Sequence, residues 1–328
     1  MANSRPRVNN AIKKQAREYQ EAHPGTHYTA AREAVLNTSI EPQWSPSPLD
    51  HIIGQHEAKK HIKNLIATRL IDEARRKRVE EHKDVIEPRK TPPVRLFLSG
   101  PPGVGKTHAA SIIHQLTSKG PLHETCASYL IGNTIGTSAM LAYDAVNSVG
   151  QGTLLIYGIE TFHYGDPFRN EVLDVLNTEI PSRTELSVII TGYNSDRINA
   201  SPRSAREFFD MFTTVIPFTT ITTHDAVEFA RKLIHESGRI AGDDVFEEIR
   251  FAVEEMLSVS PNSGMPTLDR VGNLRFVRNM LESAERASDL RLEYKYNGNY
   301  TTVSTEELFT VTADDVRNAV TTIRNSIQ

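Results

Sequence analysis

Short apolar runs alternate with longer amphipathic stretches through the middle of the chain. The runs are rich in β-branched and apolar residues, which is typical of strands, while the stretches between them carry apolar residues at helical spacing. The predicted strands cover residues 94–99, 153–158, 187–191 and 214–218. Because these runs hold few polar positions, we expect strands buried on both faces, as in a parallel sheet covered by helices.

Beyond residue 223 the pattern is helical alone. Three amphipathic stretches, which begin near Ala226, Asp243 and Leu274, indicate a separate helical subdomain. Asn297 and Gly298 then separate two short runs that contain tyrosine and threonine, and an Asn-Gly pair in this setting favours a tight hairpin turn. We therefore predict a helical subdomain that carries a small β-hairpin.

The start of the chain has a different composition. Residues 1–40 contain two helix-favouring stretches, whereas residues 41–48 are rich in proline and serine and indicate a linker. The sequence thus predicts a short N-terminal helical module over 1–40, a linker over 41–48, an α/β domain over 49–222 and the helical subdomain over 223–328.

Composition narrows the class of protein. The 328 residues include 37 basic and 41 acidic side chains, and 38% are hydrophobic, which suits a globular protein. We expect a cytoplasmic protein without membrane insertion, because no apolar run approaches the ~18 residues of a membrane helix and the N-terminus lacks a secretory signal. Cys126 is the only cysteine, which excludes an internal disulfide. The basic surplus in the N-terminal module leaves nucleic-acid contact open.

The strongest chemical signal follows the first predicted strand. Residues 100–107 read GPPGVGKT, which fits the phosphate-loop pattern G-x-x-x-x-G-K-[ST] and precedes a helix-favouring stretch. The glycines let backbone N–H groups face phosphates, Lys106 supplies positive charge, and Thr107 supplies a hydroxyl for Mg²⁺. The pattern predicts that ATP and Mg²⁺ bind here. The predicted cofactor-binding residues of this phosphate loop are Gly100, Pro101, Pro102, Gly103, Val104, Gly105, Lys106 and Thr107.

With two further segments, LDHIIGQ at 49–55 and GNLRFVRN at 272–279, the chain resembles the AAA+ ATPases. Within them it is similar to the group that contains the CbbX Rubisco activases and the EccA ATPases of type VII secretion. The resemblance implies an α/β AAA+ P-loop domain, with a parallel sheet sandwiched by helices, followed by a helical lid. It also implies that Ile53 and Gly54 pack against adenine and that Arg275 reaches the γ-phosphate as the sensor-2 residue.

The acidic pair that ends the third core strand in this family is missing. Its two positions hold Tyr157 and Gly158, and neither side chain can position a metal ion or activate water. Glu160 follows two residues later, which on an extended chain places it roughly 6–7 Å beyond the usual point. Either Glu160 compensates, or hydrolysis is weak or absent.

Two other landmarks that the resemblance implies, the pore loop and the arginine finger, are also weakened, whereas Gly192 and Tyr193 follow the family's sensor-1 form. After the predicted strand 187–191, Asn194 is the nearby side chain able to orient a water. The position of the arginine finger is open between two registers, one that selects Arg206 and one that selects Met211. Thr134 stands where the resemblance implies a pore-loop aromatic residue, which predicts a weak grip on polypeptide.

Three functions follow from this combination. The first is an AAA+ subunit that binds Mg-ATP, hydrolyses it weakly or not at all, and acts as a nucleotide-gated scaffold or partner in an oligomer. The second is an active ATPase that remodels a protein partner. The third is an AAA+ switch or loader on nucleic acid. The resemblance implies a homo- or hetero-oligomer of AAA+ subunits and a protein client for the first two.

Overall fold

The computed structural model describes residues 47–81, 92–163, 167–193, 203–258 and 265–327. The contacts divide the chain into two units, Met1–His51 and Ile52–Gln328, and each is described by itself. The described part of the first unit contains one 3₁₀ helix, η1 (Pro48–His51). The predicted N-terminal module and nearly all of the predicted linker lie outside the described residues, so the division into four parts stays a prediction.

The second unit contains a parallel five-stranded sheet in the order β2-β3-β4-β1-β5. In chain order its strands are β1 (Arg95–Ser99), β2 (Leu122–Cys126), β3 (Thr153–Tyr157), β4 (Ser187–Gly192) and β5 (Thr214–Pro217). The four strands expected from the apolar runs are present, and every pair is parallel, which confirms the predicted α/β fold.

The two edge strands differ from the expectation. The apolar pattern does not predict β2, because its LHETC sequence carries polar side chains at His123, Glu124 and Thr125. In β5 only Ile216 is buried, and Val215 is 44% exposed. The expected burial on both faces is therefore wrong for β5, since an edge strand is less fully covered by its neighbours.

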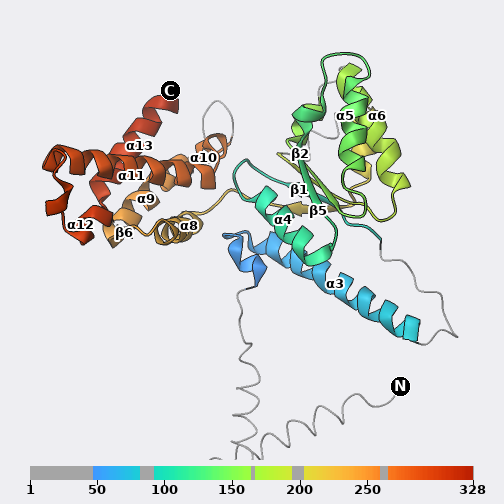
Figure 1. Ribbon diagram of the computed structural model, residues 1–328, viewed down its shortest axis with the longest axis horizontal. Helices are drawn as coiled ribbons and strands as arrows, with labels where there is room; N and C mark the ends of the chain where they lie inside the picture. The colour runs from blue at the N-terminus through green and yellow to red at the C-terminus, as the bar shows by residue number, and fades with distance from the viewer. Residues whose placement is uncertain (1–46, 82–91, 164–166, 194–202, 259–264, 328) are drawn as a thin grey trace, which may run out of the picture. The chain divides into compact units, whose positions relative to one another are not determined.

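Helices cover both faces of the sheet (Figure 1). On one face, α5 (Thr137–Asn147), α6 (Pro167–Ser182) and α7 (Arg203–Asp210) share one apolar cluster with alternate residues of β3 and β4. The helix α4 (Lys106–Thr117) contacts β1, β3 and β4 from outside this cluster, and α3 (His56–Glu81) packs against α4 and β5. Because side chains alternate along a strand, α4 covers the opposite face.

The C-terminal region is helical, as predicted. Its main helices are α8 (Thr223–Glu236), α9 (Asp243–Met256), α10 (Thr267–Val271), α11 (Leu274–Tyr296), α12 (Thr305–Phe309) and α13 (Ala313–Ile327). The helix α11 packs along α13 and α8, while α9 packs against α8 and α13. Two short parallel strands, β6 (Ile240–Ala241) and β7 (Thr310–Val311), join the connections between these helices.

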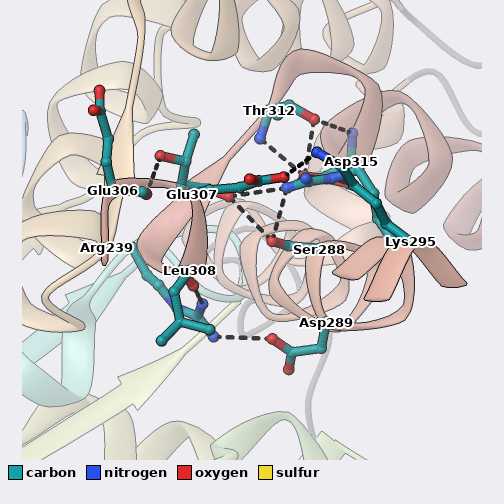
Figure 2. Close-up of polar contacts among 11 residues, drawn as sticks. Arg239, Ser288, Asp289, Lys295, Glu306, Glu307, Leu308, Thr312 and Asp315 are labelled. Atoms are coloured by element: carbon teal, nitrogen blue, oxygen red, sulfur yellow. Dashed lines mark hydrogen bonds and ion pairs between the residues drawn. The ribbon is translucent and has the colours of Figure 1, made fainter. Parts of the chain in front are cut away.

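A buried ion pair stabilises this helical region. Asp315 is 2% exposed, and its Oδ2 accepts hydrogen bonds from Arg291 Nη2 at 3.1 Å and from the Thr312 backbone N–H at 2.9 Å. Ser288 on α11 donates to the Thr310 carbonyl at 3.1 Å. Figure 2 shows Ser288, Thr312 and Asp315 converging where α11 meets the start of α13. These contacts hold β7 and α13 against α11.

The predicted β-hairpin around Asn297 is wrong. The run before it forms the last turn of α11, and Asn297 is the left-handed C-cap of that helix, with φ 44° and its N–H donating to the Glu293 carbonyl. Gly298 also has positive φ, and a 3₁₀ turn at Tyr300–Thr302 follows. An Asn-Gly pair suits both a hairpin turn and a helix C-cap, because each requires positive φ.

Candidate nucleotide-binding site

The phosphate loop joins β1 to α4, as the sequence predicts. Gly103 and Gly105 have φ of 71° and 93°, left-handed values that glycine adopts without strain. Gly105 is the N-cap of α4 and supplies no side-chain cap to the helix. The first turn of α4 therefore presents backbone N–H groups and the positive end of the helix dipole, an arrangement that favours anions.

The side chain of Lys106 lies inside this loop. Its Nζ donates to the carbonyls of Gly100 and Pro101, both at 2.6 Å. The pKa of Lys106 is lowered from 10.5 to about 8, mainly by burial. The carboxylates of Glu160 and Asp269 act against this shift, and the nearby Arg275 adds to it. A desolvated lysine ammonium held by carbonyls binds an incoming anion strongly, because little water has to be displaced.

The start of α11 packs against the back of the phosphate loop. The backbone N–H of Leu274 donates to the Gly103 carbonyl at 3.1 Å, and Asn273 Nδ2 donates to the Pro102 carbonyl at 2.9 Å. A Cβ atom added to Gly103 would lie 1.9 Å from the Gly272 oxygen and 3.4 Å from Arg275 Cγ. The structure thus brings Arg275 to the phosphate loop, although its predicted contact with the γ-phosphate stays a prediction.

The segment that was expected to contact adenine is also fixed in place. Ile53 is buried, and Gly54 has φ 57° and packs against the Asp225 carboxylate, 2.4 Å from where a Cβ would lie. Gln55 then pairs with the backbone of Thr219, donating from Nε2 at 2.8 Å and accepting at Oε1 at 3.0 Å. These contacts of Gln55 and Asp225 leave no local signal in the sequence, because their partners lie more than 160 positions away in the chain.

The end of β3 differs from the expectation in one respect. Gly158 has φ 73°, and the chain turns there into the 3₁₀ helix η3 (Ile159–His163), with the Thr161 N–H bonded to the Gly158 carbonyl at 3.2 Å. The chain is therefore not extended between Tyr157 and Glu160, and the displacement expected for an extended chain does not apply. Glu160 is exposed, and its charge acts on Lys106.

Tyr157 cannot replace the missing acid as an anion. Burial raises its pKa above the usual value near 10, and the neighbouring Cys126, Tyr129 and Glu124 raise it further. The phenol is therefore neutral at physiological pH. Its surroundings on β2 and the segment after it supply one carboxylate, Glu124, which accepts a hydrogen bond from Ser111 Oγ at 3.3 Å.

Thr107, the predicted Mg²⁺ ligand, is exposed in the first turn of α4. Across the described ranges, no group of three or more His, Cys, Asp or Glu side chains is arranged to hold a metal ion. Protein sites for Mg²⁺ commonly use one or two protein ligands beside phosphate oxygens. The residues present fit an ion that arrives with the nucleotide, rather than one held by the protein alone.

Of the remaining predicted residues, the structure describes Arg206, Met211 and Thr134. Asn194 lies outside the described residues. Arg206 is exposed on α7, whereas Met211 is partly buried against the apolar cluster, so Arg206 is the more exposed of the two. At the expected pore-loop position Thr134 bonds to the Thr137 hydroxyl, and the adjacent Ile135 is 91% exposed.

Comparisons with known proteins agree with this architecture. Residues 96–214 match the family model of the ATPase family associated with various cellular activities (AAA). The chain is 29% identical over 311 residues to the ESX-3 secretion system protein EccA3 of Mycobacterium leprae (strain TN), covering 88% of this chain and 45% of that protein. It is 28% identical to the ESX-1 secretion system protein EccA1 of the same organism, covering 74% of this chain and 43% of that protein.

The chain thus spans less than half the length of these curated relatives. Among solved structures, the FIGL-1 AAA domain in complex with ADP superposes with a TM-score of 0.52 at 16% identity, covering 71% of this chain and 73% of that chain. This likeness shows the fold. In the part of the chain that the structure describes, no helix is both long and apolar enough to cross a membrane.

Proposed function

Because this chain carries an AAA domain and is similar to the EccA ATPases, we propose that it binds ATP with Mg²⁺ at the phosphate loop and hydrolyses ATP weakly or not at all. It acts as a nucleotide-gated scaffold or partner within an oligomer of AAA+ subunits. The observation that carries this proposal is a complete phosphate loop beside a β3 end that holds Tyr157 and Gly158 in place of acids.

Each group has a distinct task in this proposal. The backbone N–H groups of the loop and of the first α4 turn bind the phosphates, and Lys106 neutralises their charge. Arg275 extends from the lid toward the terminal phosphate, for which a planar guanidinium is suited. The Thr107 hydroxyl would hold Mg²⁺, which when bound neutralises charge on the phosphate oxygens. Ile53 and Gly54 contact the base.

Slow turnover follows from the chemistry of β3. Attack by water on a phosphate requires a group that orients or deprotonates the water, and Tyr157 is neutral while Gly158 has no side chain. Binding does not require this group. We therefore expect nucleotide affinity to be retained where catalysis is poor.

The test compares binding and turnover in one preparation. Wild-type protein should bind ADP and ATP, the Lys106→Ala variant should bind at least tenfold more weakly, and Lys119→Ala should match the wild type. Lys119 is the control because it is exposed beyond the other end of α4. Failure of the wild type to bind either nucleotide would end the proposal. Turnover of order 1 s⁻¹ that disappears in Lys106→Ala would refute the claim of weak hydrolysis.

A second function, a working ATPase that remodels a protein, is favoured by the position of Glu160. The turn at Gly158 brings this carboxylate close enough for its charge to act on Lys106. If Glu160 activates the attacking water, Glu160→Gln should abolish phosphate release while ADP affinity changes little, and Glu185→Gln, at an exposed position, should behave as the wild type. Unchanged turnover in Glu160→Gln would remove Glu160 as the activating group.

Partners and location belong to the same proposal. We expect association with AAA+ subunits, identical or different, with Arg206 as the exposed candidate for an arginine finger, and we expect a protein client and a cytoplasmic location. Asn194 is the candidate for orienting water after β4. Sedimentation with and without nucleotide tests the assembly: a monomer under all conditions would contradict it. A nucleic-acid partner, the third alternative, would instead give binding that weakens steeply with salt.

A further inference from the structure

Two peptide groups of the phosphate loop are bonded from behind by the lid. The carbonyl of Pro102 accepts from Asn273 Nδ2 at 2.9 Å, and the carbonyl of Gly103 accepts from the Leu274 N–H at 3.1 Å. The Pro102 carbonyl shares its peptide group with the Gly103 N–H, and the Gly103 carbonyl shares its peptide group with the Val104 N–H. The N–H and C=O of a trans peptide point in opposite directions, so a partner on one side fixes the direction of the other.

The bonds also change the strength of those donors. A hydrogen bond accepted by a carbonyl polarises the whole peptide group, and its N–H becomes a better donor to an anion. The residues that bond these carbonyls therefore affect both the direction and the strength of the Gly103 and Val104 N–H groups. This effect reaches the phosphates without contact between Asn273 and the nucleotide.

Asn273 is held firmly enough for this task. It is fully buried, and both polar atoms of its side chain are bonded: Oδ1 accepts from the Ile221 N–H at 3.1 Å, and Nδ2 also donates to Asp269 Oδ1 at 3.0 Å. Asp269 in turn accepts from Thr220 Oγ1 at 2.8 Å. The asparagine therefore joins the phosphate loop, the connection that leads into α8, and α10.

The backbone of Asn273 is strained. Its φ of 50° and ψ of −114° are unfavourable for a residue with a side chain, and such conformations persist where surrounding contacts enforce them. Asn273 is the N-cap of α11, and Arg275 lies two residues further on. Displacement of the Pro102 and Gly103 carbonyls would therefore be passed directly to the helix that carries Arg275.

We propose that Asn273 is a positioning residue for nucleotide binding, which fixes the Gly103 and Val104 N–H groups toward the phosphates and links phosphate occupancy to the start of α11. This inference rests on the proposed nucleotide-binding function. It assigns Asn273 an effect on the phosphates and none on the adenosine part of the ligand.

The experiment measures affinity for ADP and for adenosine in three proteins: wild type, Asn273→Gly and Asn297→Gly. Glycine at 273 keeps the positive φ and removes the amide, so ADP affinity should fall about tenfold, the size of one hydrogen bond at the upper end, while adenosine affinity changes less than twofold. Asn297 is the matched control, because it is also a lid asparagine with positive φ but is exposed at the far end of α11. Its variant should match the wild type for both ligands.

A purely structural role predicts a different result. Equal loss of ADP and adenosine affinity in Asn273→Gly, or unchanged ADP affinity, would overturn the inference while leaving the proposed function intact. A wild type that binds no ADP would overturn both.

If Asn273→Gly does not fold, the double variant Asp269→Asn with Asn273→Asp tests the inference instead. It keeps one amide and one carboxylate in contact and keeps an acceptor for the Ile221 N–H, but it leaves the Pro102 carbonyl without its donor. It should show the same selective loss of ADP affinity, while adenosine affinity again changes less than twofold. Wild-type affinity for ADP in this variant would overturn the inference.

Discussion

At Gly103 the phosphate loop lies so close to the lid that no methyl group fits between them. Its φ of 71° is left-handed, and a Cβ there would lie 1.9 Å from the Gly272 oxygen and 2.7 Å from the Gly272 carbonyl carbon. Gly238 offers the matched comparison, since its φ is 68° and a Cβ there would meet nothing within 4 Å. Gly238→Ala therefore carries the conformational cost alone, whereas Gly103→Ala adds a collision with backbone.

The magnitudes separate the two variants. The left-handed conformation of an alanine costs about 1–2 kcal/mol, which we expect to be the loss in the free energy of unfolding for Gly238→Ala. In Gly103→Ala the Gly272 peptide must also move by about 1.5 Å or more to reach ordinary van der Waals contact, which begins at 3.4 Å. That movement breaks the bond from the Leu274 N–H to the Gly103 carbonyl, which adds about 1 kcal/mol. The total is about 2–3 kcal/mol.

Urea denaturation followed by circular dichroism gives the stabilities, and titration with a fluorescent ADP analogue gives the affinities. Gly103→Ala should bind ADP at least tenfold more weakly than the wild type, because the loop and the start of α11 no longer fit. Gly238→Ala should keep wild-type affinity. Equal ADP affinity in the two variants would show that contact between the lid and the phosphate loop does not matter for binding.

Three further predictions concern charge. Nucleotide affinity should fall above about pH 8, by up to tenfold per pH unit, because Lys106 loses its proton there. The free energy of unfolding without ligand should instead rise between about pH 8 and pH 10.5, because in this range the unfolded chain, with its lysine pKa of 10.5, keeps a proton that the folded protein has lost. A Lys106→Ala variant should show neither trend. Glu160→Gln should move the onset of the affinity loss to lower pH, since the carboxylate raises the Lys106 pKa, and an unchanged onset would contradict that interaction. Asp315→Asn should lower the free energy of unfolding by about 2–3 kcal/mol, because it removes the buried ion pair with Arg291. Asp314→Asn, at a side chain that is 75% exposed, should change the free energy of unfolding by less than about 1 kcal/mol. Equal effects of the two variants in urea titrations would refute the assigned burial of Asp315.

The sequence by itself determined the phosphate loop and most of the sheet. A phosphate loop is a contiguous stretch whose glycines fix the backbone locally, so residues 100–107 could be interpreted without knowledge of distant contacts. Three strands, β1, β3 and β4, followed from apolar runs because central strands of a covered parallel sheet are buried on both faces. The edge strand β5 also followed from its apolar run, although only Ile216 in it is buried. The edge strand β2 did not follow, since three of its five positions hold the polar residues His123, Glu124 and Thr125.

Tertiary structure alone decided how the site is completed. The Asn-Gly pair at Asn297 satisfies a hairpin turn and a helix cap equally well, and the packing of α11 along α13 selects the helix. The position of Glu160 depends on the turn at Gly158, and the contacts of Asn273 reach a loop 171 positions away. Local sequence specifies backbone conformation where few residues suffice, but which distant carbonyl a buried amide meets is determined only when the whole chain has packed.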